Sequence, residues 1–347
     1  MRKRNDEPGT DAKYLKGPWI VGAALFISLG IYVTGASASE NASADRNVTE
    51  TAAESEEGLL SQEDVFLSEL TAKTDGTKED ASGEETKEGT VQAEEETDLL
   101  NDFVSRYGTV VPKDLSDEEC IQALADLAEQ YPEFESIYEN REEYPMKLLI
   151  ALCNNPEMVD FVNGYLEADR SAAGVLTQAE VNREFPYYVQ WDERWGYMDY
   201  GESCLGLAGC GPTCLSMVIV ALTRNAEASP AVVGEFVMEN GYYMNGTGTM
   251  WALMTDGAAE FGVIGKELLT TTSEEKLLEL LEEGYPVICS VKAGDFTKGG
   301  HFIVLAGVED GQIRVHDPNS VERSSRLWDY ETLRKQIKKM WVFEAAS

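Results

Sequence analysis

One cysteine in this chain has the neighbours that a reactive thiol needs. Cys210 lies between Gly209 and Gly211, and Pro212 and a run of apolar residues follow it. Proline is favoured at the first position of a helix, so this pattern predicts a buried helix that begins just after Cys210. Free N–H groups and the positive dipole end at that point would stabilise a thiolate. We therefore interpret Cys210 as a candidate nucleophile, although an arbitrary cysteine is more often part of a core.

The chain has two histidines, His301 and His316, so imidazole chemistry must use one of them. His301 precedes an apolar run at 302–308, and the run at 313–315 is typical of the returning strand of a hairpin. Side chains alternate along a strand, so His316 and Asp317 point to opposite faces. We interpret His316 as a surface or packing residue and keep it as the alternative base.

The length of the hairpin loop decides where Asp317 lies. With a two-residue loop at 310–311, Asp317 falls on the opposite face of the hairpin from His301. With a three-residue loop at 309–311, Asp317 faces Ile303 and shares a face with His301, at about 7–8 Å between the backbones. We therefore predict an odd-length loop and a carboxylate that holds the His301 ring.

These groups are the ones required for attack of a thiolate on a carbonyl. The imidazole of His301 would take the thiol proton, Asp317 would fix the ring tautomer, and Cys210 would attack. An amide donor should stabilise the oxyanion, and Gln190 and the backbone N–H of Cys210 are the candidates. An ordinary polar loop residue is the alternative interpretation of Gln190. The mechanism needs no metal and no organic cofactor.

The other five cysteines are scattered without paired C-x-x-C spacing, which indicates neither a zinc site nor a dense disulfide framework. We expect Cys214 and Cys289 to pack in the core. Cys204 lies in a loop and is either a second reactive thiol or of no consequence. Cys120 and Cys153 are a possible disulfide pair if the compartment is oxidising.

Composition divides the 347 residues into five segments. The third segment is acidic and poor in aromatic residues, so it cannot bury a core and we expect a disordered stalk. The fourth carries a capping box at Ser116 and Glu119 and several prolines, which predict short helices. The predicted segments are a basic cytoplasmic leader at 1–17, a transmembrane signal-anchor at 18–37, the acidic stalk at 38–96, a helical module at 97–170 and a candidate catalytic domain at 180–347.

The apolar run from Trp19 to Ala36 is about as long as a bilayer is thick. Basic residues precede it, which predicts an internal N-terminus and an extracellular remainder. A cleaved signal peptide with its cleavage site near Ala38 is the alternative and would give a secreted protein. Because the leader is long, we favour a single-pass anchor in the cell membrane.

The formal net charge is −35, with 63 acidic and 28 basic residues. Such a chain repels phosphate backbones, which excludes nucleic acid as an expected partner. In the last segment, helices precede the apolar strands at 287–291, 302–308 and 313–315, so we predict an α+β domain. The function of the helical module is open between an accessory domain, a substrate-docking arm and an inhibitory pro-region.

Four motifs in this order resemble the papain-like cysteine peptidases of family thirty-nine, whose members process bacteriocins by cutting after double-glycine leaders. The likeness is to the stand-alone branch without an ABC transporter, and it covers about Phe185 to the C-terminus. It implies a papain-like fold with N-terminal helices packed on an antiparallel sheet, and it makes Cys210 the nucleophile, His301 the base and Asp317 the orienting residue. The oxyanion glutamine would be Gln190, which lies farther upstream than in exporter-type relatives. The motifs are 190–196, 209–213, 300–305 and 317–320.

The sequence thus predicts a membrane-tethered, extracytoplasmic cysteine peptidase that acts on a peptide or protein and uses Cys210, His301 and Asp317. Two alternatives keep the same fold. One is a cell-wall peptide amidase or transpeptidase with the same triad, and the other is a non-catalytic, papain-like peptide-binding module. The oligomeric state is left open.

Overall fold

The computed structural model describes residues 103, 105–171 and 174–346. All of them belong to one compact unit, Glu63–Ser347. The predicted leader, signal-anchor and acidic stalk lie outside the described residues, and so does the start of the predicted helical module. Within the described part, the helices are too short or too polar to cross a bilayer.

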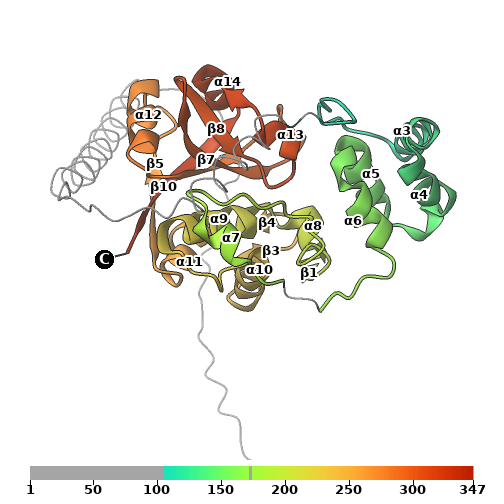
Figure 1. The fold of residues 1–347 in the computed structure, drawn as a ribbon, viewed down its shortest axis with the longest axis horizontal. Coiled ribbons are helices and arrows are strands. Elements are labelled where there is room, and N and C mark those ends of the chain that lie inside the picture. Colours follow the sequence, from blue (N-terminus) through green and yellow to red (C-terminus); the bar gives the residue numbers. More distant parts are fainter. Residues whose placement is uncertain (1–102, 104, 172–173, 347) are drawn as a thin grey trace, which may run out of the picture. The chain divides into compact units, whose positions relative to one another are not determined.

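Short helices and 3-10 turns make up the chain from residue 117 to residue 164 (Figure 1). The capping box at Ser116 and Glu119 is present, with both reciprocal hydrogen bonds. Pro132 and Pro156 open 3-10 turns, where a missing N–H has no cost. We call these elements the helical module: α3 (Asp117–Gln130), η1 (Pro132–Phe134), α4 (Glu135–Glu139), η2 (Arg141–Glu143), α5 (Met146–Asn154), η3 (Pro156–Met158) and α6 (Val159–Gly164).

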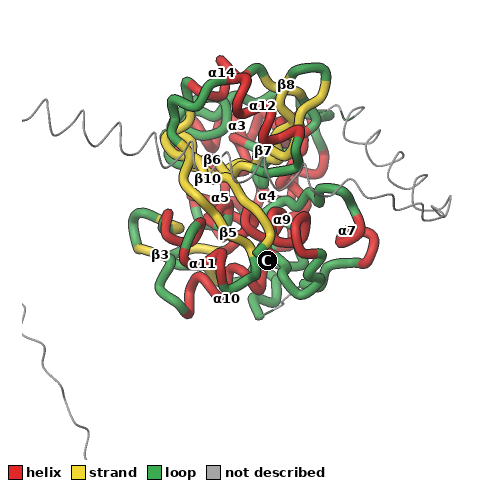
Figure 2. The backbone as a smooth tube through the Cα atoms, turned by 90° about the vertical axis from the view of Figure 1, so that its left-hand side faces the viewer, coloured by secondary structure: helices red, strands yellow, loops and turns green. Residues whose placement is uncertain are grey.

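A six-stranded sheet forms the centre of the region after residue 182 (Figure 2). Its strand order is β5-β10-β6-β7-β8-β9, and every neighbouring pair is antiparallel. The mixed helix-and-sheet class predicted from the sequence is therefore observed. The strands are β5 (Val263–Leu268), β6 (Val287–Val291), β7 (His301–Glu309), β8 (Gln312–His316), β9 (Leu327–Trp328) and β10 (Ile337–Ala345).

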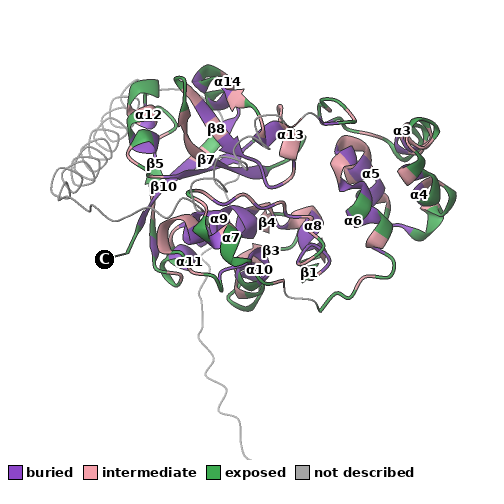
Figure 3. Cartoon of the chain, viewed as in Figure 1, coloured by how far each residue is buried: buried purple, intermediate pink, exposed green. Residues whose placement is uncertain are grey.

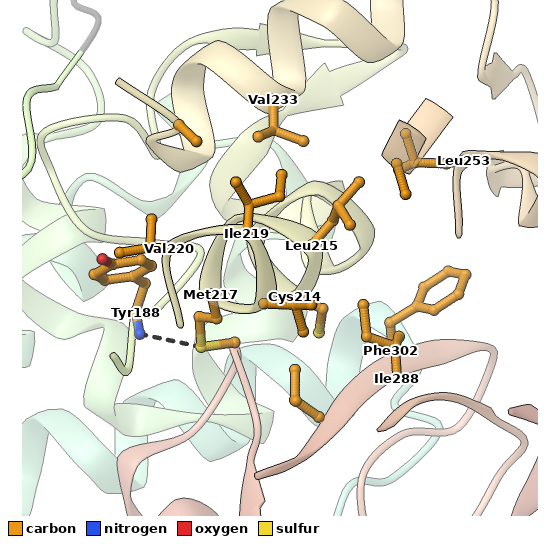
Figure 4. Close-up of a cluster of buried hydrophobic side chains, with 14 of the residues drawn as sticks. Tyr188, Cys214, Leu215, Met217, Ile219, Val220, Val233, Leu253, Ile288 and Phe302 are labelled. Carbon is orange, nitrogen blue, oxygen red and sulfur yellow. Dashed lines mark hydrogen bonds between the residues drawn. The ribbon is translucent and has the colours of Figure 1, made fainter. Parts of the chain in front are cut away.

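Helices lie against both faces of this sheet. The α9 helix (Cys210–Thr223) packs in one apolar cluster and α12 (Glu274–Glu282) in another. Because side chains alternate along a strand, β7 gives Phe302 and Val304 to the α9 cluster, and Ile303 and Leu305 to the α12 cluster. In Figure 4, α9 lies between Val233 and the strand residues Ile288 and Phe302. The sheet is thus buried on both sides.

Shorter elements complete this region. The two-stranded pairs β1–β2 and β3–β4 are both antiparallel. The remaining elements are α7 (Gln178–Asn182), β1 (Asp199–Tyr200), β2 (Ser203–Cys204), α8 (Leu205–Ala208), α10 (Pro230–Glu239), β3 (Tyr243–Met244), β4 (Gly248–Thr249), η4 (Trp251–Met254), α11 (Asp256–Ala259), α13 (Val321–Ser324) and α14 (Tyr330–Arg334).

The β7–β8 hairpin corrects the predicted loop length. Glu309 pairs with Gln312, so the loop has two residues, and both Asp310 (φ 50°) and Gly311 (φ 76°) have the positive φ of a type I′ turn. The prediction of an odd-length loop is therefore wrong. The extra residue is Ala306, which lies in a bulge of β7 where the register shifts between positions 305 and 307.

The bulge restores the register that the longer loop was expected to provide. Beyond it, Val304 pairs with His316, so the next position on each strand brings Ile303 and Asp317 together. His301 and Asp317 consequently share a face of the hairpin. The conclusion about these two side chains holds, but its cause is a bulge within the strand rather than an extra loop residue.

The helical module shares an apolar cluster with the region that contains the sheet. Phe134, Leu148 and Phe161 of the module pack in the same cluster as Tyr197 and Cys204. Figure 3 marks buried residues in α5 and in α9. The two segments that composition separates are therefore joined by a common core.

Candidate active site

Cys210 is the first residue of α9, and Gly209 is its N-cap. Pro212 is therefore the third helical residue, whereas the sequence pattern predicted it to be the first. Its missing N–H still has no cost, because the first four N–H groups of a helix have no partner within the helix. The Cys210 side chain is half-buried, whereas the residues from Gly211 to Val220 are buried. The helix thus presents one accessible thiol at its N-terminal end.

Gly211 allows α9 to lie close to the β4 strand. A Cβ atom at this position would be 2.7 Å from Cγ2 of Thr249, which is closer than such atoms approach. Thr249 is held in place by a hydrogen bond of 2.6 Å between its hydroxyl and that of Tyr200. No sequence pattern marks Thr249 as this partner, and the glycine serves helix packing beside the thiol.

His301 and Asp317 form a buried pair. Nε2 of His301 lies 2.7 Å from Oδ1 of Asp317, and the two residues are 7% and 0% exposed. Cys210 lies close enough to His301 for its charge and its side chain to raise the pKa of the ring. Because Nε2 is engaged by the carboxylate, Nδ1 is the ring nitrogen that remains for the thiol. The structure therefore brings together three of the four residues that the sequence singled out.

The charges of the site favour an ionised His301. Burial disfavours the imidazolium, but the charges of Asp317 and Cys210 outweigh it and raise the pKa of His301 to about 9. Burial would likewise raise the pKa of Asp317, but Arg323 and His301 lower it to about 2. At neutral pH the pair is thus an imidazolium beside a carboxylate.

Arg323 is a charged partner that sequence reasoning missed. Its Nε lies 2.5 Å from Oδ2 of Asp317, and its side chain is 4% exposed. The backbone N–H of Asn319 donates to the other carboxylate oxygen, Oδ1, at 2.8 Å. Arg323 follows a proline-containing turn and is typical in type of a surface residue, so the sequence carries no local signal for this contact. The carboxylate therefore has partners on both oxygens.

The backbone of Asp317 is also held on both sides. Its N–H donates to Oγ of Ser324 at 2.9 Å, and its carbonyl accepts from the hydroxyl of Tyr187 at 2.9 Å. Ser324 and Arg323 both belong to α13, so this short helix contacts Asp317 through its backbone and its side chain. The position of Asp317 therefore depends on the position of α13.

Gln190 lies between the segments that carry the nucleophile and the carboxylate. Its Nε2 donates to the carbonyl of Gly206 at 2.9 Å, and its backbone N–H donates to the carbonyl of Pro318 at 2.7 Å. Among the described residues its Oε1 has no partner, although the atom is buried. One amide proton is used by Gly206 and the second is left for another acceptor. The structure thus places Gln190 near the site and gives its amide a structural contact.

His316, the alternative base, is a packing residue. It is 3% exposed, and its ring centroid lies 5.2 Å from those of both Phe185 and Tyr187. Burial, helped by the charge of Arg314, lowers its pKa to about 3. A cavity of about 630 Å³ lies beside it, next to Ala221 near the C-terminal end of α9, so this cavity is remote from the thiol at the other end.

The other cysteines lie apart from this arrangement. Cys214 and Cys289 are buried in the two apolar clusters of the sheet, and burial raises the pKa of both thiols (Figure 4 shows Cys214). Burial also raises the pKa of Cys204. The Sγ atoms of Cys120 and Cys153 are 3.6 Å apart, so α3 and α5 bring these two thiols together in the reduced form.

Comparison with known proteins identifies the region that carries the site. Residues 182–345 match the model of the Peptidase_C39 like family. This part of the chain is therefore a C39 peptidase-like domain, and the resemblance indicated by the four motifs is confirmed. The match does not extend to the helical module.

A search of solved structures finds the peptidase domain of Streptococcus ComA, a bi-functional ABC transporter involved in a quorum sensing pathway. The two chains are 20% identical, and the alignment covers 40% of this chain and 93% of that one, with a TM-score of 0.31. No curated protein matches this chain.

Proposed function

We propose that this chain is a cysteine peptidase that hydrolyses peptide bonds through Cys210, His301 and Asp317. The observation that carries the proposal is the buried hydrogen bond between His301 and Asp317 beside a cysteine that begins a helix. The match of residues 182–345 to a family of cysteine peptidases supports the same chemistry. Gln190 is included as an oxyanion donor through its second amide proton.

The reaction follows from the charges of the site. Because the pKa of His301 is about 9, the ring holds a proton at neutral pH, and we take the reactive form of the site to be this imidazolium beside a Cys210 thiolate. The thiolate adds to the scissile carbonyl, and the imidazolium then gives its proton to the leaving amine as the C–N bond breaks. Neutral His301 next takes a proton from water, which attacks the thioester and releases the acid and the thiol.

Replacing the nucleophile tests this proposal. We expect the full chain to cleave members of a fluorogenic peptide library, and Cys210→Ala to lose cleavage completely. Cys153→Ala is the matched control, because it removes a half-buried thiol from the helical module, and it should retain cleavage. Liquid chromatography with mass detection identifies the products.

Cleavage that persists in Cys210→Ala would refute the proposed nucleophile. Release of fragments from purified cell-wall peptides, with no cleavage of extended peptides, would instead indicate an amidase or transpeptidase. An intact peptide library together with an unreactive Cys210 would indicate a binding module.

We further propose that the apolar run at 19–36 anchors the protein in the cell membrane, with the peptidase-like domain on the outer side. The argument is the length of the run and the basic residues that precede it, including Arg2, Lys13 and Lys16. A peptidase at this position would meet substrates outside the cytoplasm.

A further inference from the structure

The helical module contacts the loop that holds Asp317 in place. The two carboxylate oxygens of Glu157, in the 3-10 turn η3, accept the backbone N–H groups of Val321 and Glu322, each at 2.9 Å. Two residues before Glu157, Asn155 donates a hydrogen bond from its Nδ2 to the carbonyl of Asn319. Two side chains of the module therefore reach the segment from 319 to 322, directly after Asp317.

The N–H groups that Glu157 accepts are the first two of α13. Such groups have no partner within a helix, so an outside acceptor is needed to hold the helix end. Burial raises the pKa of Glu157, and the hydrogen bonds from Glu322 and Val321 act against this effect. The partly desolvated carboxylate is therefore held in place by its donors. The two hydrogen bonds from Val321 and Glu322 fix the carboxylate at the start of α13.

The α13 helix carries the charged partner of the candidate active site. Arg323 follows directly after Val321 and Glu322, and its guanidinium holds Oδ2 of Asp317. Glu157 also attracts Arg323, since the charge of each residue affects the pKa of the other. A continuous set of contacts therefore runs from Glu157 through α13 and Arg323 to Asp317 and His301.

A second contact joins the module to the segment before the nucleophile. The ring of Phe161, in α6, stacks on that of Tyr197 at 4.6 Å, and the hydroxyl of Tyr197 donates to the Phe161 carbonyl. The same ring lies so close to Gly196 and Gly206 that a Cβ at either position would be within 2.8 Å of it. Gly206 also accepts the amide of Gln190. The module therefore contacts both the segment that follows Asp317 and the segment that precedes Cys210.

The interface near Glu157 has no room for a separate ligand. The void between the module and α13 measures about 10 Å³, which is at most enough for one water molecule. Protein groups therefore fill this interface. A segment that had to leave for the enzyme to become active would expose the buried ring of Phe161 and leave the first N–H groups of α13 without these acceptors.

We propose that the helical module is a permanent part of the catalytic unit, and that Glu157 is a positioning residue that fixes α13 and, through Arg323, the carboxylate of Asp317. The inference deepens the proposed function and rests on it, because it takes Asp317 to be the residue that orients His301. Of the three roles that the sequence left open for the module, it favours an accessory domain.

Histidine NMR of the full chain tests this inference directly. The chain has two histidines, and His316, with a pKa of about 3, is separated from His301, with a pKa of about 9. In Glu157→Gln, which keeps the shape but not the charge, we expect the titration midpoint of His301 to fall. The rate of Cys210 alkylation by iodoacetamide should fall in parallel, by roughly two- to tenfold. Glu142→Gln, an exposed change in the same module, should leave both values unchanged.

A second variant separates position from charge. Asn155→Ser keeps a side-chain oxygen that can cap η3 but loses the amide that donates to Asn319. It changes no charge, so a lower His301 midpoint in this variant reports displacement of Asp317. It also provides the comparison if Glu157→Gln does not fold.

The two hypotheses fail in different ways. If Cys210 is reactive and both folded variants keep the wild-type midpoint and alkylation rate, the inference is overturned and the proposed function stands. If wild-type Cys210 is unreactive while the midpoint of His301 still falls in the variants, the positioning role stands and the peptidase proposal fails.

Discussion

At the scale of single residues, the site depends on a set of charges that alternate in sign. Asp317 lies between Arg323 and His301, and its carboxylate is fully buried. Removing one member of a buried ion pair leaves the other charge without compensation, which is far more costly than losing a surface pair. Arg323 is therefore expected to matter as much for the stability of the protein as for the geometry of His301.

We predict that Arg323→Met lowers the free energy of unfolding at pH 7 by about 3–5 kcal/mol. Arg323→Lys, which keeps the charge but offers a single ammonium group, should lose less. The measurement is urea unfolding followed by tryptophan fluorescence. An Arg323→Met protein as stable as the wild type would show that the pair contributes no net stability.

The same pair sets a pH window for stability. The pKa of Asp317 is about 2, below its ordinary value of 3.8, so its contribution is present above about pH 4 and is lost as the pH falls through about 2. The pKa of His301 is raised, so its contribution is present below its ordinary value of 6.5 and is lost as the pH rises through about 9. Unfolding at pH 3 should accordingly reveal a smaller difference between wild type and Arg323→Met than unfolding at pH 7.

The residues with chemical roles were the part of the site most open to sequence reasoning. Cys210 is marked by its glycines and the helix that follows, and His301 and Asp317 by a hairpin pattern. Glu157 carries no such mark, because it is more than 160 residues from its partners Val321 and Glu322. Arg323 is only six residues from Asp317, but its residue type alone does not indicate a buried ion pair. Hydrogen bonds to backbone groups leave no pattern in the side-chain types.

At the scale of elements, the start of α9 is determined by its contact with the β4 strand. Gly211 faces Thr249 at a distance that leaves no space for a Cβ atom. Helix propensity alone would favour alanine over glycine by up to about 1 kcal/mol, so the glycine is present because of packing. Any shift of this helix end would displace the thiol relative to His301.

We therefore predict that Gly211→Ala lowers the free energy of unfolding by about 1–3 kcal/mol, because overpacking outweighs the gain in helix propensity. Cys210 alkylation should slow at the same time. Gly307→Ala is the control, since a Cβ there meets nothing within 4 Å. In a double-mutant cycle, Thr249→Gly should reduce the loss of stability that Gly211→Ala causes. Additive losses of stability would mean that Gly211 does not accommodate the side chain of Thr249.

The elements show where local sequence patterns stop being informative. The apolar runs at 287–291, 302–308 and 313–315 form the adjacent strands β6, β7 and β8. The β10 strand was not predicted, although it lies between β5 and β6, because Lys338 and Lys339 interrupt its apolar residues and its partners are distant in sequence. The bulge at Ala306 was also invisible, since one extra residue in a strand and one in a loop give the same spacing.

At the scale of the whole molecule, the described residues form one unit in which the helical module and the peptidase-like region share a core. The formal net charge of −35 belongs to the entire chain, and 18 of the 63 acidic residues lie in the segment at 38–96. The proposed arrangement has an anchor, an acidic spacer and a catalytic unit in that order. It places the peptidase at a distance from the membrane surface.

The anchor can be tested on intact bacterial cells that produce the full chain with a C-terminal tag. We expect the protein to remain in the membrane fraction after alkaline extraction, and added protease to remove the tag without lysis. Leu25→Arg, which places a charge in the apolar run, should reduce membrane retention. Recovery of a protein in the medium that begins near Ser39 would contradict the anchor and establish a cleaved signal peptide.

The shared apolar cluster also affects how the molecule can be divided. The family match begins at residue 182, but the rings of Tyr197 and Phe161 are stacked across that boundary, and Cys204 is covered by the same cluster. Local opening of the module would uncover apolar surface on its neighbour, so the two segments should unfold as a single cooperative unit. Mutations deep in the module, far from any reacting atom, would then alter the lifetime of the peptidase against proteolysis.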